Sequence, residues 1–506
     1  MNPTTLSDTR AQRDTSRPAP LELSPDEFRA LGHGLIDRIA DFLASLPSRR
    51  VTPGERPRQL RAALEAERPL PNNGMDAAAL LDRATELVLS HSTFNGHPRF
   101  FGYITSSASP LGSLGDLLAS AVNPNVGAWV LSPMASEMEL QSMRWIAELL
   151  GYPSSCGGVM LSGGNMANIV CAMAATRAAA TWDVRADGIG AKPLAVYGTG
   201  ETHTWLEKFA DMSGLGTRSI RRIPIDDDAR LRVDALRDAI VADKKAGVIP
   251  GLVVGTAGTV MTGAIDPLAD IAAVCREQHV WFHADGAYGA PAAALPAAPD
   301  DLKALALADS IAVDPHKWMY APIEAGCALV RDPEALRKTF SYRPPYYRFE
   351  GVEEDPPHNF FEWGPQNTRG FRALKVWLGI QQAGRTGLVR SIEADIALAE
   401  RLHRNVQSQP ELEAMSLGLS IACFRYVPPA LRGDTSERAQ ETLNDLNEKV
   451  LARLTEEGEV FLSNAVIGGR FALRACIVNF RTTAADVDAI PEIVVRAGRA
   501  VSEELQ

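Results

Sequence analysis

The sequence predicts an α/β protein with a mostly parallel central sheet, a helical arm before it and a small α+β domain after it. From about residue 96 to residue 382, short apolar runs typical of buried strands alternate with stretches of helical periodicity. After a further helix, expected over residues 391–406, come strand runs at 421–426 and 471–478. Helices expected over 439–456 and 483–501 flank these runs, which is the pattern of a separate α+β unit.

Ordered structure is expected to begin near residue 24. Ser24-Pro25-Asp26-Glu27 combines an N-cap, a proline at the first helical position and acids in the first turn. A Pro/Arg-rich stretch over residues 51–71 predicts an extended connector, and a second helix is expected over residues 76–90. We therefore expect a disordered tail over residues 1–22 and a helical arm over residues 23–95.

The large α/β domain is expected over residues 96–390 and the small domain over residues 391–506. The clearest strand runs of the large domain are residues 158–161, 194–197, 251–254, 280–282, 310–313 and 325–330. A helix is expected to start at Asp266-Pro267, with the aspartate as its N-cap.

The composition excludes several classes of protein. A net charge of -11 disfavours nucleic acids and anionic membranes as partners, because polyanions would be repelled. No apolar run approaches the roughly 20 residues of a membrane-spanning helix, and the N-terminal residues lack the apolar core of a secretory signal. The six cysteines stand singly, as reduced thiols do, so we expect a cytoplasmic protein.

Two polar segments each follow a predicted strand. One is HADGAYG, residues 283–289, and the other is DPHKW, residues 314–318. The carboxyl ends of parallel strands meet at one edge of a sheet, where α/β proteins bind ligands. A lysine and an aspartate placed there have the chemistry that pyridoxal phosphate needs. Lys317 would form the Schiff base, and Asp285 would keep a proton on the pyridine nitrogen.

Simpler interpretations of these residues stay open at this point. A lone lysine is usually a solvated surface charge, and Asp285 could be a loop acid that caps a turn. His279, His283 and Asp285 could also bind a metal. However, His279 and His283 would lie across a turn and a strand, and no further ligand is evident near His283 and Asp285, so we expect no metal site.

Together the two segments resemble the cofactor signature of the group II pyridoxal-phosphate decarboxylases, the family of aromatic-amino-acid, histidine and glutamate decarboxylases. The resemblance runs from about Phe28 to the C-terminus. It implies the aspartate-aminotransferase-like fold, fold type I, and a homodimer with shared active sites, in which the helical arm packs on the partner. It also implies pyridoxal 5'-phosphate as cofactor and the conversion of an L-amino acid to its amine and CO2.

A phosphate site is expected in LSGGNMAN, residues 161–168, which ends a strand and opens a helix. Backbone N–H groups at a helix start can hold an anion, although any strand-to-helix turn shares this layout. The family commonly has Ser-Gly-Gly-Thr-Glu-Ala-Asn here, so Asn165 and Met166 depart from its pattern, and Asp314 stands where many members have asparagine. The resemblance assigns Gly164, Asn165, Asp314 and His316 to cofactor binding.

Other cofactor contacts come from three further segments. His203, in GTGETHTW (residues 198–205), matches the family histidine that stacks on the cofactor ring. Without the family, Gly-Thr-Gly would suggest a dinucleotide loop, but His203 stands where the third glycine should be. Thr256 resembles a family threonine near the pyridine, with a core-facing threonine as the alternative. Ala287 is expected to lie against the cofactor.

A long segment without periodicity begins with SYRPPYYRFE, residues 341–350. Such connectors inside compact domains are usually functional or disordered. In the family this is the mobile catalytic loop, which closes over a neighbouring active site and carries a tyrosine. Tyr346 fits that position best, with Tyr347 as the near alternative, and it would protonate Cα to give the amine. Downstream, Arg369 and Arg372 match family arginines, whereas Gly370 replaces one.

Two segments near residues 97–104 and 123–129 resemble the family stretches that line the side-chain pocket. Their aromatic residues match aromatic-acid decarboxylases, whereas several neighbours are smaller or more polar than in the animal enzymes. We expect an aromatic or bulky L-amino acid as substrate. An aldehyde-forming or other fold type I enzyme and a non-catalytic scaffold remain the alternatives. The expected pocket residues are Tyr103, Ile104, Asn125 and Trp129.

Overall fold

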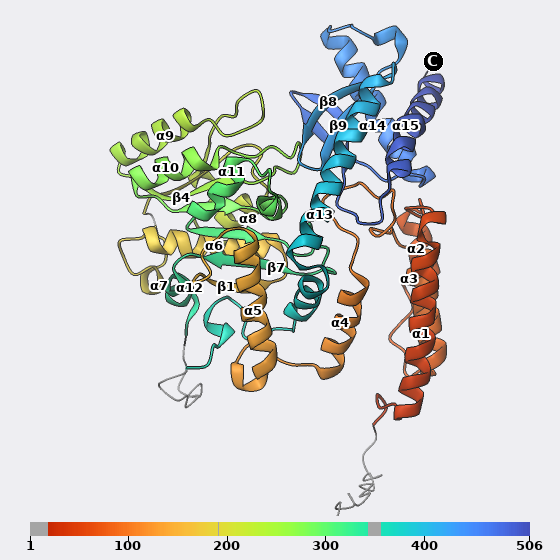
Figure 1. Cartoon of the computed structure of the whole chain (residues 1–506), viewed down its shortest axis with the longest axis horizontal. Coiled ribbons are helices and arrows are strands. Elements are labelled where there is room, and N and C mark those ends of the chain that lie inside the picture. The colour runs from red at the N-terminus through yellow and green to blue at the C-terminus, as the bar shows by residue number, and fades with distance from the viewer. Residues whose placement is uncertain (1–18, 191, 343–355, 506) are drawn as a thin grey trace, which may run out of the picture. The chain divides into compact units, whose positions relative to one another are not determined.

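The computed structural model describes residues 19–190, 192–342 and 356–505. Within them the chain forms two compact units (Figure 1): one comprises the residues up to 48 together with 55–92, and the other comprises residues 49–54 and 93–506. Most of the tail expected over residues 1–22 lies outside the described residues. Among the described helices, none is both long enough and apolar enough to span a membrane.

The first unit contains α1 (Pro25–Ser45), α2 (Pro57–Leu64) and α3 (Ala77–Ser90). Ser24 caps α1 as expected: its hydroxyl accepts from the backbone N–H of Glu27, whose carboxylate accepts from the backbone N–H of Ser24. The extended connector expected over residues 51–71 is wrong, because α2 lies inside it. Pro57 occupies the first position of α2, where a missing N–H breaks no helical hydrogen bond.

The second unit is built on a seven-stranded sheet with the order β1-β7-β6-β5-β4-β2-β3. The strands from β6 to β3 run parallel, which confirms the mostly parallel sheet, and β7 runs antiparallel to both β6 and β1. No helix separates β6 from β7, so the chain turns back directly and the strand reverses. The strands are β1 (Gly157–Leu161), β2 (Leu194–Gly198), β3 (Ile220–Arg222), β4 (Ile249–Thr256), β5 (Phe282–Asp285), β6 (Ser310–Val313) and β7 (Gly326–Val330).

Helices connect and cover this sheet. The helix expected to start at Asp266 in fact has Pro267 at its N-cap position. The Asp266 carboxylate instead accepts from the backbone N–H groups of Thr256 (2.8 Å) and Leu231 (2.7 Å), which ties the end of β4 to a distant turn. The helices are α4 (Pro110–Val122), α5 (Pro133–Leu149), α6 (Gly164–Ala179), α7 (Val184–Asp187), α8 (Trp205–Met212), α9 (Val233–Lys245), α10 (Leu268–Gln278), α11 (Asp300–Lys303) and α12 (Pro333–Phe340).

The long helix α13 (Ala373–Ser408) leads into the C-terminal part, with a kink at Gly384 (φ 61°, ψ 175°). Figure 1 shows it running from beside α4 and α5 to a second sheet, which is antiparallel with the order β10-β11-β9-β8. Because α13 crosses residue 390, the boundary between a large and a small domain there stays a prediction. The remaining elements are β8 (Leu412–Gly418), β9 (Ile421–Tyr426), α14 (Glu437–Glu457), β10 (Ser463–Ile467), β11 (Arg470–Cys476) and α15 (Ala484–Glu504).

Candidate active site

A pocket opens at the carboxyl ends of β4, β5 and β6, against the start of α6. It brings together residues that lie far apart in the sequence, and many of them are those predicted for the cofactor site. The predicted residues that line it are Ile104, Gly164, Asn165, His203, Thr256, Asp285, Ala287 and Lys317.

Lys317 lies in the turn that follows β6. The backbone N–H of Lys317 donates to the carbonyl of Asp314, and the side-chain Nζ lies 3.0 Å from Asp314 Oδ2. The Asp314 carboxylate is buried, and its other oxygen has no partner among the described residues. The amine is therefore held at the pocket by one carboxylate and remains partly accessible, with 20% of the side chain exposed.

Asp285 ends β5 and is fixed through both carboxylate oxygens. Trp205 donates its indole N–H to Oδ2 at 2.7 Å, and the backbone N–H of Ala287 donates to Oδ1 at 3.2 Å. Both side chains are buried. The arrangement presents a fixed negative charge to the pocket, as a partner for a protonated ring nitrogen must.

His203 stands between β2 and α8. Burial is the largest cause that lowers the pKa of His203, while the nearby charges act in both directions, so a neutral ring faces the pocket at neutral pH. Its Nδ1 accepts from the backbone N–H of Trp205 at 3.3 Å. A neutral, oriented imidazole is suited to lie against an aromatic ring.

His283 points into the core rather than into the pocket. Its Nε2 lies 2.7 Å from Asn168 Oδ1, its Nδ1 lies 2.9 Å from Ser310 Oγ, and burial lowers its pKa to about 4. Both ring nitrogens are therefore occupied by protein groups. Within the described part of the chain, no group of three histidine, cysteine or acidic side chains is arranged to hold a metal.

The turn from β1 into α6 leaves its backbone N–H groups without a side-chain cap. Gly163 has φ +119°, and no side chain caps the first turn of α6. A Cβ atom on Gly164 would lie 2.5 Å from Asp314 Oδ2, and one on Gly326 would lie 2.4 Å from the Gly163 carbonyl carbon. The uncapped N–H groups at this helix start can receive an anionic phosphate.

These groups fit pyridoxal phosphate. Lys317 would hold its aldehyde, Asp285 its ring nitrogen, His203 one face of its ring and the start of α6 its phosphate. The hydroxyl of Thr256 is also buried beside the pocket with no partner in the described chain, so it is free to bind a ligand.

The structure does not bring all predicted pocket residues into this cavity. Asn125 Oδ1 accepts from the backbone N–H groups of Gly127 and Arg369, both at 3.0 Å, so this carboxamide orders its own turn. The Trp129 indole donates to Glu137 at 2.8 Å, and Tyr103 is 65% exposed. Asp314 and His316 lie beside the lysine rather than in the pocket lining. Tyr346 and its alternative Tyr347 lie outside the described residues.

Arg369 does not line the pocket but forms a buried ion pair beside it. Its guanidinium is buried against Glu139 Oε1 at 2.5 Å and also donates to the carbonyls of Val126 and Met160. This buried ion pair joins α5, β1 and the turn that contains Asn125. Arg372 pairs with Glu324 at 2.7 Å.

Sequence reasoning missed several lining residues. Glu201 stands two positions before His203 in a segment that the histidine already marked, and Tyr288 stands in the same segment as Asp285. Trp205 does not line the pocket, but it fixes Asp285. The lining residues not predicted are Asn168, Glu201, Gly258, Val260 and Tyr288.

Comparison with known proteins gives a consistent result. The pyridoxal-dependent decarboxylase conserved domain matches residues 57–427. The aromatic-L-amino-acid decarboxylase of Bacillus atrophaeus is 33% identical over 464 residues, which cover 92% of this chain and 94% of the relative. The phenylacetaldehyde synthase of a Rosa hybrid cultivar is 30% identical and covers 90% of each chain.

Solved structures share the whole architecture. The structure of Oryza sativa TDC with PLP and tryptamine superposes with a TM-score of 0.87 at 28% identity, covering 96% of this chain and 99% of that one. Mouse CSAD superposes with a TM-score of 0.88 at 27% identity, covering 94% and 99%.

Proposed function

Because the chain belongs to the pyridoxal-dependent decarboxylase family, we propose that it converts an aromatic L-amino acid to its amine and CO2. It is a pyridoxal-phosphate-dependent carboxy-lyase that acts on an amino acid. The observation that carries the proposal is the single pocket at which Lys317, Asp285 and His203 meet from three different strand ends.

Each residue has a distinct task in this proposal. Bound pyridoxal phosphate supplies an electron sink for the electron pair that remains when CO2 leaves. Lys317 would bind the cofactor covalently, and Asp285, oriented by Trp205, would keep a proton at the ring nitrogen. His203 would cover one ring face and exclude water from it. Tyr346 would deliver a proton to Cα of the product.

The charge of the pocket supports a neutral side chain in the substrate. Lys317 is the only lysine or arginine among the described residues that line it, and its own partner is Asp314. An acidic substrate side chain would therefore lack a cation there, whereas Ile104 and Val260 offer apolar surface. This favours an aromatic substrate over glutamate-like ones.

We propose a homodimer with shared active sites. An apolar stripe on α4 is open to solvent in the single chain, with Leu114, Leu117, Leu118 and Val122 between 50% and 66% exposed. A surface of this kind usually marks a protein interface. Sedimentation of the wild-type protein and of Leu117→Glu tests this: a dimer that the substitution leaves intact would contradict an interface at α4.

We also propose a cytoplasmic location. All six cysteines lie within the described residues, none forms a disulfide, and five of them are buried. Such thiols are typical of proteins from reducing compartments. Fractionation of the source cells, with disulfide mapping of the isolated protein, tests this proposal.

The decisive experiment has two parts. Borohydride reduction of the cofactor-loaded protein, followed by peptide mass spectrometry, is expected to find the reduced cofactor on Lys317 and on no peptide of Lys317→Ala. Incubation with each of the twenty proteinogenic L-amino acids is then scored for CO2, amine and aldehyde. Aromatic substrates giving CO2 and amine support the proposal, CO2 with aldehyde favours the activity named for the Rosa relative, and no CO2 from any substrate overturns it.

A further inference from the structure

The turn that carries Lys317 is anchored by residues on its C-terminal side. Lys317 has Asp314 as its side-chain partner, and the next residues are Trp318, Met319 and Tyr320. The Trp318 indole donates to Asp395 Oδ2 at 2.9 Å, and the Tyr320 hydroxyl donates to the same oxygen at 2.6 Å. Asp395 lies on α13, beyond its kink.

Asp395 is placed to hold the side chains of Trp318 and Tyr320 in position. It is 2% exposed, so its carboxylate is shielded from water. Trp318 and Tyr320 are buried as well, so water cannot replace these bonds. One carboxylate thus fixes two side chains of the turn to a helix that lies more than seventy residues later in the sequence.

The backbone of the turn needs such an anchor. Tyr320 has φ +56°, the left-handed region that a bulky side chain rarely adopts. Backbone strain of this kind persists only where surrounding contacts determine the conformation. The bond from the Tyr320 hydroxyl to Asp395 supplies such a contact.

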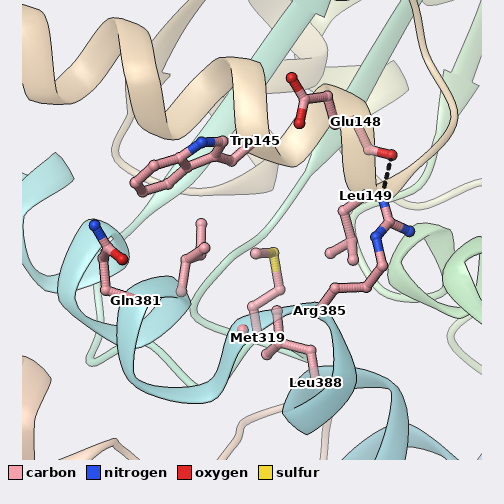
Figure 2. Close-up of a pocket in the computed structure, with 9 residues that line it drawn as sticks. Trp145, Glu148, Leu149, Met319, Gln381, Arg385 and Leu388 are labelled. Carbon is pink, nitrogen blue, oxygen red and sulfur yellow. Dashed lines mark hydrogen bonds between the residues drawn. The ribbon is translucent and has the colours of Figure 1, made fainter.

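The residue between the two anchors, Met319, is buried and lines a cavity. Figure 2 shows Met319 pointing into a cavity between α5 and α13, near Trp145 and Leu388. Met319 is itself buried in the hydrophobic core, and the bonds of Trp318 and Tyr320 to Asp395 fix the turn on either side of it.

A second contact joins the turn to the C-terminal sheet. Trp318 stacks on Tyr288, with ring centroids 4.9 Å apart, and the Tyr288 hydroxyl lies 2.6 Å from Ser420 Oγ, in the turn between β8 and β9. Tyr288 also lines the active-site pocket. The C-terminal part of the chain thus reaches the lysine turn directly through Asp395 and indirectly through Tyr288.

We propose that Asp395 is a positioning residue for Lys317, acting through Trp318 and Tyr320 to hold the lysine amine at the pocket. The inference rests on the proposed role of Lys317 as the residue that binds the cofactor. Asp395 itself does not line the pocket. Loss of its hold would reduce the fraction of molecules in which the amine is correctly placed.

Tyr320→Phe is the primary test, because it removes one hydroxyl and leaves Asp395 in place. Tyr152→Phe is the matched control: Tyr152 is equally buried, and its hydroxyl donates to the carbonyls of Ala308 and Asp309, at the opposite end of β6. The measured quantities are the melting temperature, the rate at which the apoprotein combines with added pyridoxal phosphate, followed by absorbance, and kcat and KM.

We expect both variants to lose similar thermal stability. Only Tyr320→Phe should slow cofactor association, by about tenfold, and lower kcat while KM for the substrate stays unchanged. Asp395→Leu should show the same pattern more strongly, and Asp395→Asn, which keeps an acceptor oxygen, should recover part of the rate. Equal association rates and kcat in Tyr320→Phe and Tyr152→Phe would overturn the inference.

The two failures can be told apart. If the unsubstituted protein gives no borohydride-fixed cofactor on Lys317, the proposed function itself fails. If that product forms normally and only the comparison of the two phenylalanine variants shows no difference, the role of Asp395 alone is refuted.

Discussion

The indole of Trp205 and the carboxylate of Asp285 form a buried hydrogen bond of 2.7 Å, although eighty residues separate them in the sequence. Trp205 is the first residue of α8, directly after the segment that carries His203, and Asp285 is the last residue of β5. The two groups proposed to contact the cofactor ring, His203 and Asp285, are therefore oriented by the same residue.

Trp205→Phe is expected to weaken cofactor binding. The change keeps an aromatic ring but removes the donor to Asp285 Oδ2, and a buried hydrogen bond to a charged group contributes about 1.5–3 kcal/mol. The dissociation constant for pyridoxal phosphate should rise about tenfold or more. Fluorescence titration of the apoprotein measures it. Trp182→Phe, which removes an indole donor to the Gly188 carbonyl at the surface, should bind the cofactor normally; a similar loss in both variants would contradict a specific role.

Gly326→Ala is expected to disturb the phosphate site. The added Cβ would lie 2.4 Å from the Gly163 backbone, so the turn into α6 must move. Affinity should fall more for pyridoxal phosphate than for pyridoxal, which lacks the phosphate. Gly370→Ala is the control, because no atom lies within 4 Å of its added Cβ. Equal losses for the two vitamers, measured by equilibrium titration, would place the effect elsewhere.

Features fixed by neighbouring residues could be predicted from the sequence. The capping groups of α1 and the strand that precedes Lys317 depend on local sequence, and the structure has them as expected. The strand expected over residues 280–282 instead spans Phe282–Asp285, so Asp285 ends the strand rather than following it. The sequence does not reveal α2, because a stretch rich in proline and arginine is typical of an extended connector, although Pro57 starts a short helix there.

Features that depend on distant partners could not be predicted. Asp266 has the sequence context of a helix cap, but its carboxylate binds backbone N–H groups of Thr256 and Leu231. The family resemblance places Asn125 in the substrate pocket, whereas its carboxamide oxygen accepts from the backbone N–H of Arg369. In each case, the orientation of the side chain is set by a chain segment whose position the sequence does not reveal.

The stability conferred by His283 is expected to depend on pH. Burial lowers the pKa of His283 from 6.5 to about 4. Between these two pH values the histidine is neutral in the folded protein and takes up a proton when the protein unfolds. Its contribution is fully present above pH 6.5 and is lost as the pH falls towards 4. Asp395 contributes the opposite trend, because burial raises its pKa to about 7 and its charged form is disfavoured in the folded state.

Comparison of the wild type with His283→Gln isolates the contribution of His283 to the pH dependence of stability, because both proteins retain Asp395. Glutamine can still donate to Asn168 but does not titrate. The variant should melt below the wild type at pH 7, and the gap should narrow as the pH falls from 6.5 to about 4. Melting curves recorded across this range measure the gap. A gap that stays constant or widens at low pH would show that His283 is not kept neutral by the fold.

Asp314→Asn is expected to tighten the binding of pyridoxal phosphate. The buried Asp314 carboxylate lies against the first residue of α6, where the phosphate is proposed to bind, and two negative groups at short range repel each other in a poorly solvated site. The same carboxylate holds Lys317 Nζ at 3.0 Å, so its removal also frees the amine for the cofactor. Asparagine keeps the size of the side chain and removes only its charge.

The dissociation constant of this variant should fall about tenfold for pyridoxal phosphate and change less for pyridoxal, since only pyridoxal phosphate carries the repelled group. Titration of the apoprotein with both vitamers at low and high salt measures this. An equal gain for both vitamers would assign the effect to the release of Lys317 alone, and weaker binding of pyridoxal phosphate would show that Asp314 assists the phosphate site instead of opposing it.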